Sequence, residues 1–170
     1  AARNSAGILD ASTLGKIDIQ GTDASEFLNR VYTNAWSKLA IGKCRYGLML
    51  NEDGMVYDDG VTTRLDENHY IMTTTTGGAA NVLGKLEDYL QTEWPELDVY
   101  LSSVTDHYAT ASICGPNSKK ILNKLIPDLD LSDESFPHMS FKNAKINNIK
   151  CKIMRISFTG EHTYEINIQA

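Results

Sequence analysis

Hydrophobic and polar residues alternate along "GKIDIQG" (15–21), and this period of two predicts a β-strand. The next segment, "TDASEFLNRVY" (22–32), has its apolar residues at the spacing of one helical face. Asp23 and Glu26 stand at the spacing of a capping box, which predicts where this helix begins. The pattern therefore predicts a strand, a glycine turn and a helix.

Three short β-rich runs follow between residues 44 and 76. They are separated by "NEDG" (51–54) and "LDEN" (65–68), both of which are typical of turns. This arrangement predicts an antiparallel meander. Residues 77–94 then return to helical spacing, and Pro95 lies just beyond the end of the predicted helix.

The second half of the chain begins like the first. The segment "ASICGPNSKKILNKLI" (111–126) aligns without a gap with "IDIQGTDASEFLNRVY" (17–32), and a further β meander is predicted over 141–169. Chance similarity between two ordinary strand–turn–helix units is the alternative to a duplication. The predicted fold class is α+β, with two subdomains of antiparallel sheet and helices, roughly 1–105 and 106–170.

Composition narrows the class of protein. The 170 residues are 42% hydrophobic, enough for a sizeable core, yet no stretch is long and apolar enough for a membrane span, and no signal peptide is recognisable. We therefore expect a cytoplasmic protein without a membrane partner. The chain lacks an initial methionine and stops within an alternating pattern, so we expect it to be a piece of a longer protein.

Charge and cysteine content exclude other classes. The net charge is −6 and the basic residues are scattered, which argues against a nucleic-acid partner. The three cysteines are far apart and odd in number, so we expect reduced thiols. The four histidines show no metal-ligand spacing, and no metal site is predicted.

Two adjacent carboxylates, Asp58 and Asp59, follow a short apolar run in "GMVYDDG". They could be ordinary solvated turn residues. Side chains of adjacent residues in a strand point to opposite faces, so only one of the two can enter a core-side cavity. A carboxylate in such a cavity would be desolvated, its pKa would rise, and it could serve as a general base or stabilise a cation.

A third carboxylate, Glu165, raises the same choice. In "TYEINI" it alternates with Tyr164 and Ile166, which suit a core, so Glu165 faces the other way. It could be a surface glutamate. It could also line a ligand cavity, where a carboxylate accepts two parallel N–H donors from a heterocycle.

Four segments in chain order resemble motifs of the tetrahydrofolate-binding aminomethyltransferase family, whose type member is the T-protein of the glycine cleavage system. These segments are "GILDAST", "GMVYDDG", "SICGPNS" and "SFTGEHTYEI". Others, including "NRVYTN", "RYGLML" and "DYLQTEWP", resemble the branch formed by the α subunits of heterotetrameric sarcosine oxidases. The resemblance covers nearly the whole chain and implies the folate-binding fold of this family, truncated before its C-terminal β domain.

The resemblance also implies roles for individual residues. Asp58 matches the catalytic aspartate beside the reacting folate nitrogens, and Glu165 matches the glutamate that binds the pterin. The two should line one cavity between the subdomains, with Asp59 pointing the other way. Further folate contacts are expected from Leu14, Tyr46, Thr75 and Phe158, the last of which replaces a tyrosine of the family motif.

The implied function is that of an oxidoreductase module: capture of the one-carbon unit from oxidised sarcosine on tetrahydrofolate, giving 5,10-methylenetetrahydrofolate. Flavin and NAD are expected elsewhere in a complex with other sarcosine oxidase subunits, and we expect the isolated fragment to be inactive. A folate-fold binding or scaffold domain without catalysis, or a stand-alone aminomethyltransferase, are the alternatives.

Overall fold

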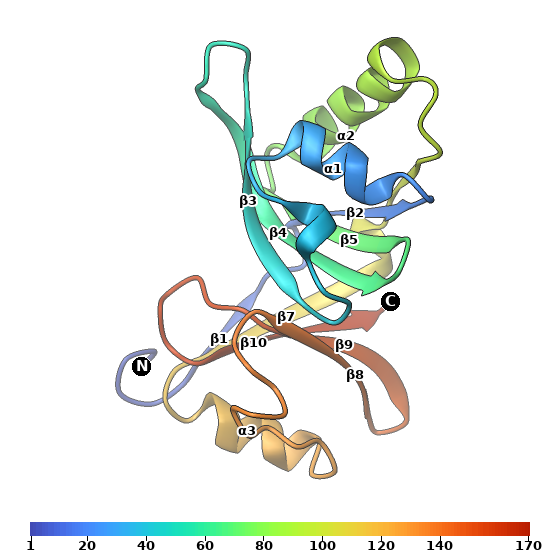
Figure 1. Cartoon of the computed structure of the whole chain (residues 1–170). Coiled ribbons are helices and arrows are strands. Elements are labelled where there is room, and N and C mark those ends of the chain that lie inside the picture. The colour runs from blue at the N-terminus through green and yellow to red at the C-terminus, as the bar shows by residue number, and fades with distance from the viewer. The chain divides into compact units, whose positions relative to one another are not determined.

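The computed structural model describes all residues from 1 to 170 and divides into two compact units (Figure 1). One unit is Thr13–Thr105, and the other combines Ala1–Ser12 with Asp106–Ala170. Each unit contains one antiparallel sheet of five strands with helices, which confirms the predicted α+β class. No helix has the length and apolar character needed to cross a membrane.

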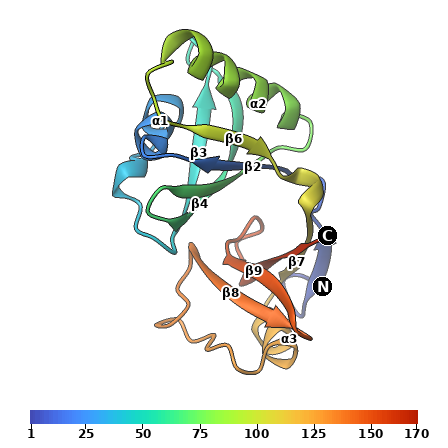
Figure 2. The ribbon, with the colours of Figure 1, turned by 90° about the vertical axis from the view of Figure 1, so that its right-hand side faces the viewer.

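The sheet of the unit 13–105 has the strand order β3-β4-β5-β2-β6, and β6 is paired to the edge of β2 (Figure 2). Its strands are β2 (Gly15–Gln20), β3 (Cys44–Leu50), β4 (Val56–Asp66), β5 (His69–Thr74) and β6 (Tyr100–Ser103). Its helices are α1 (Ala24–Val31), the short η1 (Trp36–Lys38), α2 (Ala79–Asp88) and the π-helical η2 (Tyr89–Glu93) that continues α2; η3 (Thr105–His107) follows β6. The meander over 44–76 and the helix from 77 onward are thereby confirmed.

One face of this sheet packs against α1 and α2. Apolar residues of β2, β3 and β5 form a single core with the inner faces of both helices; this core includes Ile17, Ile19, Phe27, Leu28, Trp36, Met49, Tyr70, Met72, Val82 and Leu86. Gly47 is needed for this packing, because a Cβ there would lie 2.5 Å from Cζ2 of the buried Trp36. The opposite face of β3 and β4 carries the side chains of Tyr46 and Asp59.

The start of α1 differs from the prediction in its capping. Asp23 does occupy the N-cap position, but its side chain forms no capping hydrogen bond within the helix. Its carboxylate instead accepts a hydrogen bond from the backbone N–H of Asp98 at 2.9 Å. The predicted capping box is therefore wrong, because a tertiary contact with the segment before β6 takes the carboxylate that local spacing had assigned to the helix.

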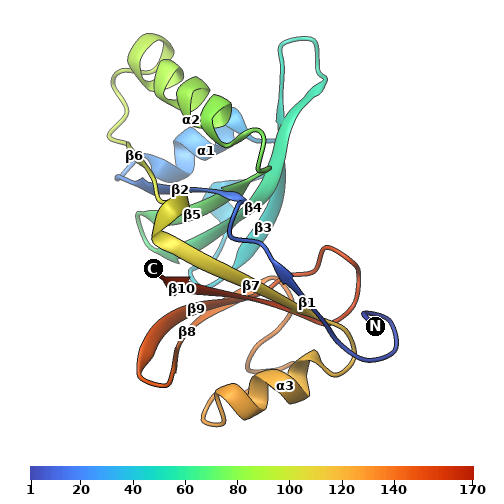
Figure 3. The same cartoon turned by 180° about the vertical axis from the view of Figure 1, so that it is seen from behind.

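The sheet of the other unit has the strand order β1-β7-β10-β9-β8, and α3 covers one of its faces (Figure 3). Its elements are β1 (Gly7–Asp10), β7 (Tyr108–Cys114), α3 (Ser118–Leu125), β8 (Ser140–Ile146), β9 (Ile149–Arg155) and β10 (Thr163–Gln169). The predicted meander over 141–169 is confirmed. The first twelve residues differ from the sequence-based division, since β1 pairs with β7 and so belongs to this unit.

Both units contain the strand–glycine–helix element that the sequence repeats. Gly21 follows β2 with φ 135°, and Gly115 follows β7 with φ 111°. A side chain is disfavoured at both positions by the backbone conformation, and a Cβ on Gly21 would also lie 2.0 Å from the carbonyl oxygen of Asp98. The three cysteines are free thiols, as predicted.

Candidate functional site

An irregularity in the β3–β4 hairpin decides where the two aspartates point. Met49 of β3 pairs with Asp58 of β4, whereas the next residue, Leu50, pairs with Val56. Tyr57 is therefore an extra residue, a β-bulge, and it shifts the alternation of side chains along β4. Since Met49 belongs to the core beneath the helices, Asp58 lies on the helix-covered face.

Asp58 is enclosed by the turn that connects β5 to α2. Its side chain is buried, with the residue only 5% exposed. The hydroxyl of Thr75 donates to Oδ1 at 2.6 Å, and the backbone N–H of Thr75 donates to Oδ2 at 3.2 Å. Gly78, the N-cap of α2, allows this approach, because a Cβ there would lie 2.6 Å from Oδ1 of Asp58. Both carboxylate oxygens are thus engaged by the protein itself.

Asp59 lies on the opposite face of β4, as expected for the second residue of the pair. It pairs with Leu48 of β3, and its Oδ2 accepts a hydrogen bond of 2.8 Å from the hydroxyl of Tyr46. Tyr46 is 48% exposed and Asp59 is half-buried, so neither side chain is enclosed by the protein. The hydrogen bond to Asp59 raises the pKa of Tyr46, with smaller contributions from burial and from the charge of Asp59.

The two carboxylates also act on a neighbouring tyrosine. Tyr32 ends α1 in an extended conformation, forms an isolated bridge with Met49 and is buried. Burial raises the pKa of Tyr32, and the negative charges of Asp58 and Asp59 raise it further. The phenol of Tyr32 therefore stays protonated beside the carboxylates of Asp58 and Asp59.

In the other unit, Glu165 stands on the sheet face opposite the α3 core. It pairs with Ser112 of β7 and with Met154 of β9, while its neighbours Tyr164 and Ile166 pack into the core, as the alternation predicts. Other polar residues share its face: Thr110, Ser112, Thr163 and Asn167 are all buried. The hydroxyl of Thr110 donates to Oδ1 of Asn167 at 2.7 Å. Glu165 is thus a half-buried carboxylate on a face rich in hydrogen-bonding groups.

The remaining predicted site residues are in varied surroundings. Leu14 is half-buried just before β2, and its carbonyl accepts a hydrogen bond of 3.0 Å from Nζ of Lys16. Thr75 contacts Asp58 as described. Phe158, in the loop between β9 and β10, is 97% exposed. Tyr46, Thr75 and Leu14 belong to the unit 13–105, and Phe158 and Glu165 to the other, so a cavity shared by Asp58 and Glu165 stays a prediction.

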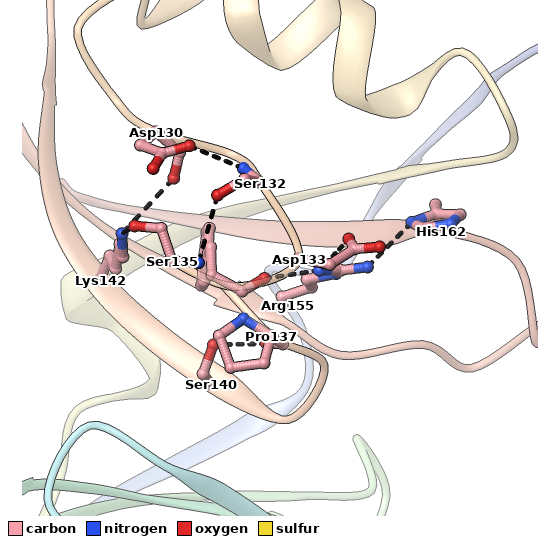
Figure 4. Close-up of polar contacts among 10 residues, drawn as sticks. Asp130, Ser132, Asp133, Ser135, Pro137, Ser140, Lys142, Arg155 and His162 are labelled. Carbon is pink, nitrogen blue, oxygen red and sulfur yellow. Dashed lines mark hydrogen bonds and ion pairs between the residues drawn. The ribbon is translucent and has the colours of Figure 1, made fainter.

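A second polar cluster surrounds Arg155 at the end of β9 (Figure 4). Its guanidinium donates to the carbonyl of Phe136, forms an ion pair of 2.8 Å with Asp133 and contacts Nδ1 of His162 at 3.2 Å. The hydrogen bond from Arg155 is the main cause that lowers the pKa of Asp133. A pocket of about 300 Å³ adjoins the cluster. Because Arg155 is engaged by three protein groups, it ties the segment before β8 to the β9–β10 loop.

These features define an α+β domain in which a strand–glycine–helix unit occurs twice, and in which Asp59 and Glu165 stand on sheet faces turned away from the helices. A family model described as the GCVT N-terminal domain matches residues 1–170. The chain therefore belongs to the GCVT N-terminal domain family.

Curated relatives fall into two groups. The chain is 56% identical over 169 residues to the sarcosine oxidase subunit alpha of Corynebacterium sp. (strain P-1), covering 99% of this chain and 18% of that protein. It is 34% identical over 167 residues to the aminomethyltransferase of Listeria monocytogenes serotype 4a, covering 98% of this chain and 44% of that protein. The chain thus spans about a fifth to under half of the length of these relatives.

Solved structures of both kinds share the fold. The glycine cleavage system aminomethyltransferase T of Bartonella henselae matches 99% of this chain and 43% of its own, with a TM-score of 0.83 and 25% identity. The heterotetrameric sarcosine oxidase of Corynebacterium sp. U-96, in complex with pyrrole 2-carboxylate, matches 99% of this chain and 78% of its own, with a TM-score of 0.71 and 15% identity. The predicted resemblance is confirmed at the level of the family and of both groups of relatives.

Proposed function

We propose that this chain is the folate-binding part of a sarcosine oxidase α subunit. In this proposal it captures the one-carbon unit of oxidised sarcosine on tetrahydrofolate, giving 5,10-methylenetetrahydrofolate. The 56% identity to a sarcosine oxidase subunit alpha supports the parent enzyme, and the similarity to aminomethyltransferases supports one-carbon transfer. Flavin and NAD would bind elsewhere in the parent complex, together with the other subunits.

The observation that carries the proposal is the hydrogen-bonded pair of Tyr46 and Asp59. The phenol of Tyr46 fixes the carboxylate of Asp59 through a hydrogen bond of 2.8 Å, and this carboxylate is half-buried, not enclosed. A carboxylate that exchanges a proton with a reacting nitrogen must be within reach of that nitrogen. Asp58, to which the motif resemblance assigned this role, is buried and engaged through both oxygens by Thr75. We therefore assign the catalytic carboxylate of the proposed reaction to Asp59, and Tyr46 to the same site.

The residues present fit a reduced folate. A pterin offers an N–H and an amine along one ring edge, and the half-buried carboxylate of Glu165 can accept both in parallel. The ring nitrogens of a reduced folate supply the nucleophile for the one-carbon unit. Phe158 and Leu14 remain proposed contacts of the same ligand, whereas Thr75, whose hydroxyl is engaged by Asp58 and Gly78, would support the site through Asp58 instead of contacting the ligand.

The chain's own groups would then act by charge and position. The carboxylate of Asp59 would stabilise the positive charge of an iminium group and accept the proton that leaves the reacting nitrogen. The hydroxyl of Tyr46 would hold the carboxylate in one orientation while remaining protonated. The remaining rate enhancement would come from holding the two reactants in the geometry of the reaction.

The test uses the full-length protein with sarcosine and tetrahydrofolate, and it measures methylenetetrahydrofolate and free formaldehyde together. Asp59→Asn should lower methylenetetrahydrofolate formation by about 10²- to 10⁴-fold, the usual contribution of a positioned acid or base, and release formaldehyde instead. Folate should still bind to this variant. Unchanged methylenetetrahydrofolate formation by Asp59→Asn would refute the assignment.

A second candidate is a stand-alone type of aminomethyltransferase, which the higher TM-score of 0.83 to the aminomethyltransferase T of Bartonella henselae favours. The same assay separates the two. A protein that forms methylenetetrahydrofolate from an aminomethyl donor but not from sarcosine would be of this second type. A protein that binds folate without either reaction would be a binding or scaffold domain.

A further inference from the structure

We infer that Asp58 is a positioning residue, which holds the bulged part of β4 against the β5–α2 turn so that Asp59 is presented to Tyr46. This inference rests on the proposed function, because it assigns to Asp58 the support of the carboxylate at which the reaction would occur. It gives the first aspartate of the pair a purpose that differs from that of the second.

The pairing of β4 shows why such support is needed. On its β3 side, the strand is paired continuously from Asp58 to Thr63. On its β5 side, pairing begins only at Thr62, which is opposite Met72. The segment of β4 between Asp58 and Thr62, which includes Asp59, is therefore not part of a backbone ladder with β5. Other contacts must hold this segment on its β5 side.

Two side-chain contacts replace the missing ladder. The hydroxyl of Thr73 accepts from the N–H of Val61 at 3.0 Å and donates to the carbonyl of Val61 at 3.2 Å. The carboxylate of Asp58 accepts both hydrogen bonds from Thr75, as described. Asp59 lies between these two anchored positions, so its orientation depends on both of them.

The turn that receives Asp58 is itself held in shape. The hydroxyl of Thr75 also accepts a hydrogen bond of 3.1 Å from the N–H of Gly78 at the start of α2. The negative charge of Asp58 is favourable near the N-terminus of this helix. Asp58, Thr75 and Gly78 thus form one network, and removal of the Thr75 hydroxyl should loosen it without changing the carboxylate of Asp59.

The experiment compares Thr75→Val, which removes the hydroxyl and keeps the shape, with Thr75→Ser, which restores the hydroxyl. Thr76→Val is the matched control, because Thr76 is exposed and its hydroxyl contacts only that of Thr13 among the side chains. In the full-length protein we expect Thr75→Val to lower methylenetetrahydrofolate formation about 10- to 100-fold, as misplacement of a catalytic group does. The affinity of Thr75→Val for folate should stay near that of wild type. Thr75→Ser and Thr76→Val should form methylenetetrahydrofolate at nearly the wild-type rate.

A double mutant tests whether the effect runs through Asp59. Thr75→Val should cause no further loss in an Asp59→Asn background, because the group that it positions is already gone. A full additional loss in that background, or a change in folate affinity with normal one-carbon capture, would overturn the inference. If Thr75→Val does not fold, Gly78→Ala gives the same test, since its Cβ would press on Oδ1 of Asp58. If neither Thr75→Val nor Gly78→Ala folds, the inference is also overturned, because the network would then be required for the stability of the whole fold.

A readout that needs no folate separates this inference from the proposed function. The phenol of Tyr46 reports on its hydrogen bond to Asp59, so ¹⁹F NMR of fluorotyrosine-labelled protein can follow its titration, with Tyr46→Phe identifying the signal. The pKa of Tyr46 should fall toward its ordinary value in Thr75→Val and not in Thr76→Val. An unchanged titration would refute the positioning role even if the wild-type protein proved to form no methylenetetrahydrofolate.

Discussion

Gly60, the residue after Asp59, offers a sharp test of how closely β4 and β5 approach. A Cβ at this position would lie 1.8 Å from the carbonyl oxygen of Thr73 and 2.8 Å from its carbonyl carbon. Both neighbours are backbone atoms, so no change of rotamer can relieve the overlap. The strands would have to separate by roughly 1 Å, because contacts of this kind essentially never occur below 3.0 Å.

The expected magnitude follows from this overlap. Overpacking of a well-packed site costs about 1–3 kcal/mol, and in a chain of this size each kcal/mol changes the thermal midpoint by about 2–4 °C. Gly60→Ala should therefore lower the midpoint by about 2–12 °C. The measurement is thermal unfolding of the 170-residue chain, followed by circular dichroism.

Gly84 is the matched control. It lies in α2, is exposed, and has open space where a Cβ would be added. Replacing glycine by alanine inside an exposed helix stabilises it by about 0.5–1 kcal/mol, so Gly84→Ala should raise the midpoint by about 1–4 °C. The same chemical change should thus have opposite signs at the two sites. A Gly60→Ala variant as stable as wild type would refute the reasoning about β4.

Two further predictions concern stability and binding. Hydrogen bonding and charge from Arg155 lower the pKa of Asp133 in the folded state. The ion pair therefore stabilises the fold above the unfolded pKa of about 3.9, and this stabilisation is lost as pH falls through the folded pKa. The thermal midpoint of Asp133→Asn should therefore lie below that of wild type at pH 6 and converge with it in acid; a constant difference down to pH 2 would contradict the pairing. The isolated 170-residue chain should bind tetrahydrofolate weakly or not at all and show no turnover, because it spans only 18% of the sarcosine oxidase subunit alpha and 44% of the aminomethyltransferase that it matches; low-micromolar binding by calorimetry would contradict this.

The sequence by itself predicted much of the local structure. Period and turn chemistry were sufficient for the two meanders, for both helices that follow a glycine turn and for the helix over 77–94, because these signals are local in the chain. Alternation was also sufficient to assign Glu165 and Tyr164 to opposite faces of one strand. The motifs were specific enough to identify the family.

Only the tertiary structure decided which aspartate meets which environment. Alternation shows that Asp58 and Asp59 face opposite ways, but the bulge at Tyr57 and the pairing with Met49 decide that Asp58 is the one beneath the helices. The same holds for Asp23, whose carboxylate binds the backbone of a residue 75 positions away along the chain rather than its own helix. In each case the deciding partner lies on another strand or segment, and a periodic pattern within one segment contains no information about that partner.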